Sequence, residues 1–421
     1  MFREDKLRAL LEGRRILIAG YGREGKSAER LIQRLEPEAQ YTIAVQVENG
    51  KWKAENGEWH EDWPFDLVIK SPGIPNFQFS IFNFQLTSLT DLFLQVYGDL
   101  TIGVTGTKGK STTASLIHHL LPDSILAGNI GIPLFDILDD LREDSIVVAE
   151  LSCHQLENIH RAPHIAVLLN LFQEHLDHYE SYMDYKMAKM QIGLKQREGD
   201  HFFYCTDNEE LDSLVESYEL RVKSCLHPYS INEVMDKERE VLESFPLQGD
   251  HNLSNALVAC RVADLMGTPA SPKRLSSFQG LRHRMEKVGE VHGITWYDDS
   301  ISTIPAAAIA AVKALDRVDT LILGGFDRGI DYQPLVEFLQ NHPIPNLVFV
   351  GQAGRRIYSA IQPLSPSSTL VEDDYTKIVP WCAEHTPQGG VVLLSPAAAS
   401  YDAFKNFEHR GDFFAEQISK L

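Results

Sequence analysis

The chain alternates short apolar runs with amphipathic stretches, a pattern typical of parallel sheets covered by helices. An apolar run at 15–19 precedes a helical pattern at 26–35, and further strand-like runs stand at 41–45 and 66–70. The intervening segment 49–63 places glycines and tryptophans in a polar context, which favours a hairpin over a helix. We therefore expect a first α/β domain that ends near residue 97.

The same alternation continues to the C-terminus. It predicts strands at 100–102, 145–150, 166–170, 201–205, 288–297, 320–323, 346–350 and 390–394. A length of 421 residues corresponds to about three domains at roughly 150 residues each. We expect three α/β domains, at 1–97, 98–284 and 285–421.

A glycine-rich run, GVTGTKGKSTT at 103–113, stands between a predicted strand and a predicted helix at 112–120. Such a turn directs backbone N–H groups and a helix N-terminus at phosphate oxygens. Lys110 would reach the β- and γ-phosphates of a nucleotide, and Ser111 or Thr112 would offer a hydroxyl to Mg²⁺. The strict P-loop spacing requires a glycine where this chain has Val104. The alternative is a flexible turn with a surface lysine, but the pattern favours ATP binding by a central P-loop domain.

The first predicted strand leads into a second glycine motif, GYGREG at 20–25. Glycines here let the backbone approach a diphosphate at a helix N-terminus. A dinucleotide site also expects an acid about 20 residues later, where this chain offers Gln46 and then Glu48. Three interpretations stay open: a diphosphate such as that of a UDP-sugar, an empty structural turn, and a nicotinamide site.

Charge and cysteine content narrow the class of protein. The 39 basic and 59 acidic residues give a net charge of −20, which would repel nucleic acid and anionic membranes. The five cysteines include no CxxC pair, which predicts reduced thiols and no zinc site. The charged N-terminus lacks an apolar signal core, and no apolar run is long enough to span a bilayer. We expect a cytoplasmic, monomeric enzyme without nucleic-acid or membrane partners.

Two predicted strands end in possible metal ligands. Glu150 closes one strand, and the sequence NLFQEHLDHY at 170–179 follows another. Glu150 and His175 are plausible Mg²⁺ ligands with Asp177 in reserve, although a polar loop before a helix near 181 explains the second segment equally well. Lys186 and Lys189 on that helix read as solvated surface charges, because an ammonium group cannot bind a metal.

Beyond these motifs, the chain resembles the Mur ligase family of peptidoglycan synthesis, and within it the branch that adds D-glutamate. The resemblance is weakest in the first hundred residues. The stretches that carry it are GVTGTKGKSTT from 103, GNIGIP from 128, ELSCHQLE from 150, NLFQEHLDHY from 170, GDHNLSNALVA from 249, GLRHRMEKV from 280, YDDSISTIPAA from 297, LGGFDRG from 323 and LSPAAASYDAFKNFEHRGDFF from 394. It implies an α/β fold of three domains: an N-terminal Rossmann-like domain that binds the UDP-sugar, a central P-loop ATPase-type parallel sheet, and a C-terminal Rossmann-like domain that binds the amino acid.

The resemblance also implies roles for individual residues. Lys189 matches the family's carbamylated lysine, which reverses the interpretation of that residue as a surface charge. The catalytic and metal residues would be Lys110, Ser111, Glu150, His175 and carbamylated Lys189, with two Mg²⁺ sites. ATP would contact Gly106, Thr107, Lys108, Gly109, Lys110, Ser111, Thr112, Asn252, Asn255, Arg284 and Asp299. The UDP-sugar would contact Gly20, Gly22, Ser71, Pro72, Gly73, Asn129, Gln155 and His175, and the amino acid would contact Thr303, Arg328, Ser395 and Phe404.

The implied reaction joins D-glutamate to the L-alanine carboxylate of UDP-N-acetylmuramoyl-L-alanine through an acyl phosphate, with ATP converted to ADP. The alternatives are a sister ligase that adds another amino acid such as L-glutamate, a folylpolyglutamate-type ligase, and a non-catalytic sensor of UDP-sugar or nucleotide.

Four departures from the family pattern bear on these roles. Arg328 stands where lysine is frequent, and Ile301 also replaces a frequent lysine. Lys108 replaces the usual asparagine of the P-loop. Cys153 and His154 replace a more usual Ser–Phe pair.

Overall fold

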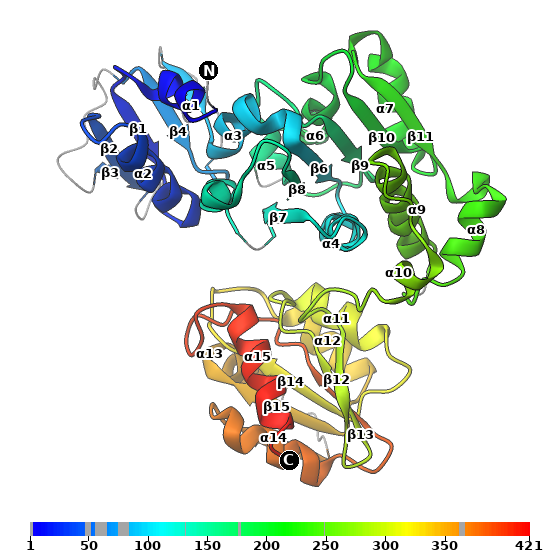
Figure 1. Cartoon of the computed structure of the whole chain (residues 1–421). Coiled ribbons are helices and arrows are strands. Elements are labelled where there is room, and N and C mark those ends of the chain that lie inside the picture. The colour runs from blue at the N-terminus through cyan, green and yellow to red at the C-terminus, as the bar shows by residue number, and fades with distance from the viewer. Residues whose placement is uncertain are drawn as a thin grey trace. The chain divides into compact units, whose positions relative to one another are not determined.

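The computed structural model describes residues 3–46, 52–54, 65–74, 84–130, 132–175, 178–247, 249–361 and 367–421. The chain divides into two compact units, Met1–Phe278 and Gln279–Leu421. The first unit contains two sheets and the second contains one, so the expected three sheets are present (Figure 1). The first unit spans the expected boundary at 97/98, and the three expected domain ranges stay a prediction.

The N-terminal sheet has the strand order β3-β2-β1-β4-β5 and is parallel except for the β2–β3 pair. Its strands are β1 (Ile16–Ala19), β2 (Tyr41–Gln46), β3 (Trp52–Ala54), β4 (Leu67–Lys70) and β5 (Gln85–Thr87). The accompanying helices are α1 (Arg3–Leu11), α2 (Arg23–Leu35) and α3 (Leu89–Tyr97). The antiparallel β3 is the described part of the expected hairpin at 49–63, and the rest of that segment lies outside the described residues.

The central sheet is parallel throughout, with the order β11-β10-β9-β6-β8-β7. Its strands are β6 (Thr101–Thr105), β7 (Ser124–Gly128), β8 (Ile146–Glu150), β9 (Ile165–Leu168), β10 (His201–Cys205) and β11 (Cys225–Tyr229). The helices of this part are α4 (Lys110–Leu120), α5 (Cys153–Leu156), α6 (Tyr182–Leu194), α7 (Glu209–Tyr218), α8 (Asp236–Leu242), α9 (Asp250–Leu265) and α10 (Pro272–Ser276), with 3₁₀ turns η3 (Gly98–Leu100), η4 (Leu134–Asp140), η5 (Glu219–Arg221) and η6 (Ile231–Glu233). Because β6 lies between β8 and β9, the loops that leave these three strands meet at one sheet edge.

The second unit contains the sheet β12-β13-β17-β14-β15-β16, in which only β12 and β13 pair antiparallel. The strands are β12 (Glu286–Val291), β13 (Ile294–Asp298), β14 (Thr320–Gly324), β15 (Asn346–Val350), β16 (Ser368–Val371) and β17 (Val391–Leu394). The helices are α11 (Pro305–Lys313), α12 (Gln333–Asn341), α13 (Gly351–Ala360), α14 (Tyr375–His385) and α15 (Phe407–Ile418).

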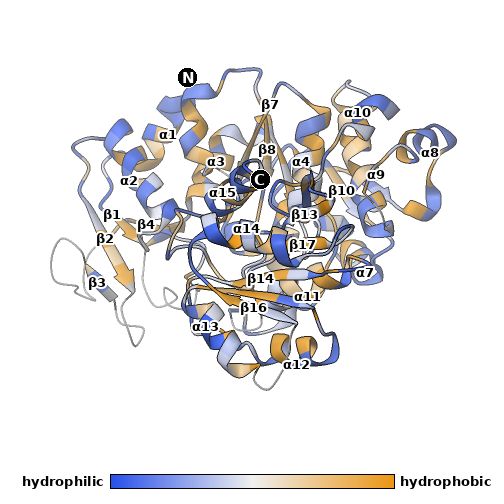
Figure 2. Ribbon diagram, turned by 90° about the horizontal axis from the view of Figure 1, so that it is seen from below, coloured by the Kyte–Doolittle hydropathy of each residue, from blue (hydrophilic) through white to orange (hydrophobic). Residues whose placement is uncertain are grey.

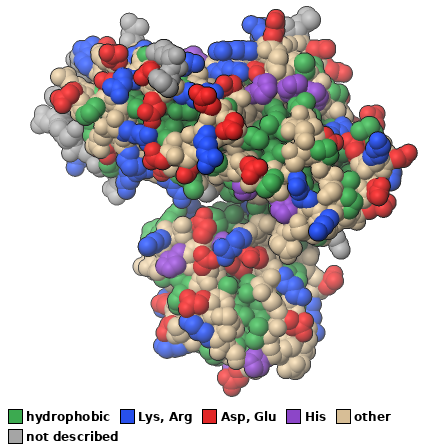
Figure 3. All heavy atoms as spheres, in the orientation of Figure 1, with side chains coloured by type: hydrophobic (Ala, Val, Ile, Leu, Met, Phe, Trp, Pro, Cys, Tyr) green, Lys and Arg blue, Asp and Glu red, His purple; other side chains and the backbone are tan. Residues whose placement is uncertain are grey.

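Burial follows the pattern expected for covered parallel sheets. The central strands β1, β4, β6, β14 and β15 are buried at every position. Figure 2 shows strands such as β1, β14 and β16 largely in the hydrophobic colour, whereas many helices carry both colours. Acidic and basic side chains are interspersed over the face seen in Figure 3. Within the described part of the chain, no helix is both long and apolar enough to cross a membrane.

Candidate active site

The glycine-rich run forms the expected turn between β6 and α4. Gly106 and Gly109 adopt φ values of +155° and +85°, which L side chains rarely tolerate. A Cβ atom on Gly109 would lie 2.7 Å from Oδ1 of Asn255, so α9 packs directly against the loop. Lys110 Nζ donates to the carbonyl oxygens of Gly106 and Thr107, both at 2.9 Å. Burial lowers the pKa of Lys110, although Glu150 opposes this shift.

Glu150, at the end of β8, lies beside this loop and is only 2% exposed. Its Oε1 accepts a hydrogen bond from Asn129 Nδ2 at 2.7 Å, whereas its buried Oε2 accepts none from the described residues. A buried carboxylate oxygen without a donor is costly unless a cation or solvent compensates it. Asn129 and Glu150, expected to contact the UDP-sugar and the metal respectively, are therefore direct neighbours.

Lys189 lies on α6 and is 2% exposed, so the interpretation of this residue as a surface charge is wrong. Its Nζ donates to the Gly106 carbonyl at 2.8 Å and lies 5.0 Å from the centre of the Tyr185 ring. Burial, together with the positive charge of Lys110, lowers the pKa of Lys189 to about 7. By contrast, Lys186 on the same helix pairs with Glu210 at 2.9 Å.

The loop that follows β9 is hydrogen-bonded to the P-loop. Thr107 Oγ1 accepts from the Phe172 amide at 2.9 Å and lies 2.8 Å from the Tyr185 hydroxyl. The Lys108 amide donates to Asn170 Oδ1 at 2.8 Å, and its ammonium group pairs with Glu174. This pairing gives the unusual Lys108 a structural role in joining the two loops.

His175 in the same loop is exposed and has a left-handed backbone, with φ of 58°. Its ring centroid lies 5.0 Å from that of His154 and 5.9 Å from that of Tyr185. The proposed reserve ligand Asp177 lies outside the described residues. The role of His175 as a metal ligand stays a prediction.

The remaining ATP-site predictions in the first unit fall around the same turn. Thr112 is buried in the first turn of α4, and Ser111 beside it is half-buried. Asn252 lies in the first turn of α9, one turn before Asn255. These residues share the region of the loop, and their contacts with a nucleotide stay predictions.

The two turns expected to hold the UDP-sugar contact each other at the ends of β1 and β4. Gly20 has φ of +90°, and a Cβ there would lie 2.8 Å from Ser71 Oγ, which donates to the Gly20 carbonyl at 3.2 Å. A Cβ on Gly25 would lie 2.1 Å from the same carbonyl, so this glycine serves helix packing. Gly22 and Gly73 face open space on their Cβ side. Pro72 lies in the turn between Ser71 and Gly73.

Gln155 joins this region to the central sheet. Its Nε2 donates to Glu24 Oε1 at 2.9 Å, and its Oε1 completes a capping box with Ser152 at the start of α5. Burial raises the pKa of Glu24. Gln155 is itself only 4% exposed, so its side chain holds the GYGREG turn against α5.

A buried ionic cluster beside α5 escaped the sequence analysis. Lys70, 1% exposed, pairs with Glu157 at 3.2 Å, and His178 Nε2 lies 2.8 Å from the other Glu157 oxygen. Although burial opposes both shifts, the His154–Glu157 interaction lowers the pKa of Glu157 to about 2 and, with Cys153, raises the pKa of His154 to about 9. No motif marks this cluster, because its members come from β4, α5 and the loop before α6.

In the second unit, Arg284 is exposed on a loop whose neighbours His283 and Met285 both have left-handed backbones, with φ of 60° and 48°. Asp299 is 2% exposed and accepts from the Met285 amide at 3.3 Å. Burial raises the pKa of Asp299. Asp299 therefore orders the loop that carries Arg284, a function distinct from the expected contact with a nucleotide.

The four residues expected to bind the amino acid divide into two pairs. Arg328 and Thr303 come together, since Nη2 of Arg328 donates to the Thr303 carbonyl at 3.1 Å. Ser395 is completely buried and donates to Asp299 Oδ2 at 2.7 Å, and the Phe404 ring packs 5.4 Å from that of Tyr375. Phe404 itself is half-buried, and the contacts of Ser395 and Phe404 with an amino acid stay predictions.

Arg410, which the sequence analysis missed, holds the loops at this end of the sheet in place. It is 1% exposed and donates to the carbonyls of Ser300, Ala398 and Ala399 at 2.8–3.2 Å. Because these carbonyls follow β13 and β17, one buried guanidinium fixes both loops. Its sequence position near the start of α15 gives no sign of this role.

Comparison with known proteins places this architecture. Residues 104–263 match the Mur ligase middle domain, and residues 283–398 match the Mur ligase, glutamate ligase domain. A UDP-N-acetylmuramoylalanine–D-glutamate ligase from Geobacillus kaustophilus is 32% identical over 97% of this chain and 98% of its own. The chain belongs to the Mur ligase family.

Other members of the family differ in the amino acid that their names specify. A UDP-N-acetylmuramoyl-L-alanine–L-glutamate ligase from Salinispora tropica is 35% identical, covering 84% of this chain and 83% of its own. The crystal structure of the Thermotoga maritima MurF ligase in complex with ADP aligns over 96% of this chain and 95% of its own, with a TM-score of 0.55 and 18% identity. That likeness confirms the Mur ligase fold expected from the sequence.

Proposed function

We propose that this Mur ligase joins D-glutamate to the L-alanine carboxylate of UDP-N-acetylmuramoyl-L-alanine, with ATP converted to ADP and phosphate, in peptidoglycan precursor synthesis. The observation that carries the proposal is the meeting of Lys110, Lys189 and Glu150 at one P-loop. A sensor would need no buried cation pair beside an unsatisfied carboxylate. The cytoplasmic location and monomeric state expected from the sequence are part of this proposal.

The substrate carboxylate is a poor electrophile, so it must be activated before an amine can attack it. The substrate carboxylate would attack the γ-phosphorus of ATP to form an acyl phosphate with release of ADP, and Lys110 would offset the repulsion between the anions. The neutral amine of glutamate would then attack the acyl carbon, lose a proton and expel phosphate.

The residues present fit the magnesium that the proposal requires. Mg²⁺ prefers hard oxygen ligands, and the unpartnered Oε2 of Glu150 is such a ligand in a buried position. The Ser111 hydroxyl and His175 would complete the metal-binding set. Bound at this site, Mg²⁺ would neutralise phosphate charge during the transfer.

Lys189 fits the carbamate implied by the family resemblance. An ordinary lysine is almost entirely protonated at neutral pH, whereas a pKa of about 7 leaves much of Lys189 as the free amine. The amine would add to CO₂, forming an N–C bond and releasing one proton. The product is a carboxylate that supports Mg²⁺ and replaces repulsion between Lys189 and Lys110 by attraction.

The amino acid is the open part of the proposal, because the relatives include both D- and L-glutamate ligases. Arg328 is exposed beside Thr303 and can pair with a carboxylate in two-point geometry. It suits either stereoisomer of glutamate and disfavours an uncharged side chain such as that of alanine.

The test measures ADP release and product mass with purified UDP-N-acetylmuramoyl-L-alanine, ATP and Mg²⁺. D-Glutamate, L-glutamate, L-alanine and diaminopimelate are compared as acceptors. We expect turnover with D-glutamate to exceed that with every other amino acid. Preference for L-glutamate would establish the sister activity, and nucleotide binding without ligation of any acceptor would support the sensor.

A further inference from the structure

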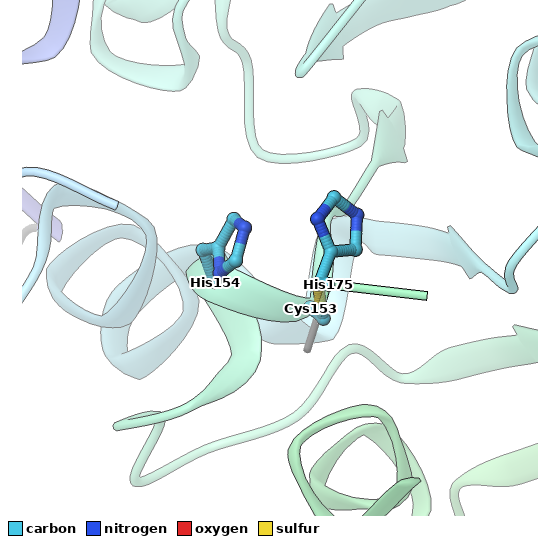
Figure 4. A group of neighbouring side chains, drawn as sticks. All are labelled: Cys153, His154 and His175. Carbon is cyan, nitrogen blue, oxygen red and sulfur yellow. The ribbon is translucent and has the colours of Figure 1, made fainter. Parts of the chain in front are cut away.

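Two groups of metal-ligating side chains meet beside the proposed magnesium site, and of their members only His175 has a role in the reaction described above. Among the described residues, Cys153, His154 and His175 offer ligand atoms that all lie within 4.8 Å of one another. His154 also forms such a group with Glu157 and His178. Figure 4 shows the two imidazole rings of the first group next to each other, with Cys153 close to His175.

We propose that Cys153, His154 and His175 form a binding site for a thiophilic divalent cation of the zinc class. A tetrahedral zinc ion bound by one sulfur and two imidazole nitrogens needs ligand atoms about 3.5 Å apart. The observed spacing is therefore within reach of small side-chain rotations. Sulfur and imidazole together select zinc over Mg²⁺, which prefers oxygen.

Contacts with Glu157 and Tyr179 orient His154. Its Nδ1 lies 3.4 Å from Glu157 Oε1 and 3.2 Å from the Tyr179 hydroxyl. Engagement of Nδ1 by these groups leaves Nε2 as the nitrogen for coordination, the arrangement that carboxylate-supported zinc histidines use. Glu157 is fixed in turn by Lys70 and His178.

A cavity lies beside the residues that surround His154, although Cys153, His154 and His175 do not line it. The cavity of about 360 Å³ is lined by Glu157, His178 and Tyr179 from the His154 surroundings, together with the acidic Glu180 and Asp184. Carboxylates along this cavity favour the entry of a cation. The sequence contains no CxxC pair and was therefore expected to hold no zinc site. The proposed ligands come from α5 and a separate loop, so no local motif marks them.

The inference has a functional consequence that rests on the proposed function. His175 is also the expected magnesium ligand, and the ring nitrogen that binds zinc cannot bind Mg²⁺ at the same time. Occupation by zinc would therefore inhibit ligation.

The first experiment needs no substrate and tests the site directly. Cobalt(II) is titrated into the nucleotide-free full-length protein while the thiolate-to-cobalt charge-transfer absorption is recorded, and Zn²⁺ is then added as competitor. We expect a one-to-one band that Zn²⁺ abolishes. Cys153→Ser should lose the band, and His154→Phe should weaken Zn²⁺ binding by about 100-fold or more, since even outer-shell partners are worth 10–100-fold.

The exposed Cys225 provides the matched control, because it offers a thiol on β11 with two histidines nearby in the sheet. Cys225→Ser should leave the band unchanged. A band that survives in Cys153→Ser, or that disappears in Cys225→Ser, would overturn the proposed site. Absence of any band in the wild-type protein would overturn it as well.

The second experiment separates the site from the proposed function. The double variant C153S/H154F carries the Ser–Phe pair usual in the family and should retain ligation. Its half-inhibitory Zn²⁺ concentration should rise at least about tenfold above that of the wild type. Equal inhibition of both proteins would refute the consequence. Cobalt binding in a protein without any ligase activity would instead refute the proposed function and leave the site intact.

Discussion

Replacement of Lys189 by alanine tests the carbamate most directly. With a pKa of about 7, about half of the Lys189 side chains are neutral at pH 7, whereas a lysine at 10.4 would be neutral in roughly one molecule in 2,500. The buried position thus raises the fraction able to react with CO₂ by about a thousandfold. Loss of a preorganised electrostatic group typically lowers kcat by 10²–10³, and we expect K189A to lose at least about 100-fold.

The assay is ADP release under saturating substrates, with and without added acetate or formate. A short carboxylate should enter the space vacated in K189A and restore part of the activity, but it should not affect the wild type. Lys186→Ala is the matched control on the same helix, because Lys186 pairs with the partly exposed Glu210 and not with the Gly106 carbonyl. Near-normal turnover by K189A would refute the reasoning, and an inactive variant that no carboxylate rescues would refute the carbamate.

Three other changes probe the rest of the molecule. Lys110→Ala should remove roughly 3 kcal/mol of transition-state stabilisation in kcat/KM, and near-normal turnover would contradict its role at the phosphates. Arg328→Ala should raise the KM for glutamate at least tenfold more than that for ATP, whereas equal changes would indicate a structural role. In the full chain, Asp298→Asn should destabilise the second unit by about 1.5–3 kcal/mol at pH 6, as followed by urea unfolding, because His283 pairs with Asp298 at 2.7 Å. Burial lowers the pKa of His283, but Asp298 opposes burial and raises that pKa in the folded state. The stabilisation is therefore present at low pH and is lost as the pH rises through the pKa of folded His283. An equal effect of Asp298→Asn at pH 9 would contradict the ion pair.

The alternation of apolar and polar positions was sufficient to predict the sheets but not their edges. The buried strands β1 and β14 lie within one residue of the expected positions, and β6 begins one residue later and ends three residues later than expected. The edge strand β11 was missed because it contains Pro228 and is only partly buried, so it lacks the apolar run of a covered strand. The single strand expected at 288–297 is a hairpin, since His292 and Gly293 adopt φ of 54° and 68° and turn the chain back.

Some residues of the candidate site could likewise be predicted from the sequence, and others could not. Lys110 and Glu150 were predictable because the P-loop motif and the end of a β-strand determine their positions within a parallel sheet. The surroundings of Lys189 were not predictable from the residues, since α6 has no strongly apolar face that marks one side as buried. Lys189 is buried because α6 packs against the P-loop, and no local sequence pattern encodes that packing.

The shared acceptor of Lys110 and Lys189 links these observations. Both ammonium groups donate to the one carbonyl of Gly106, at 2.9 and 2.8 Å, in surroundings that disfavour two positive charges. Either entry of nucleotide phosphates near Lys110 or addition of CO₂ to Lys189 would relieve this repulsion. The two events act differently, because phosphate would stabilise the protonated form of Lys189, whereas carbamylation requires the neutral form. CO₂ addition should therefore be easier before ATP binds, and protein equilibrated with bicarbonate before ATP is added should reach full activity without a lag.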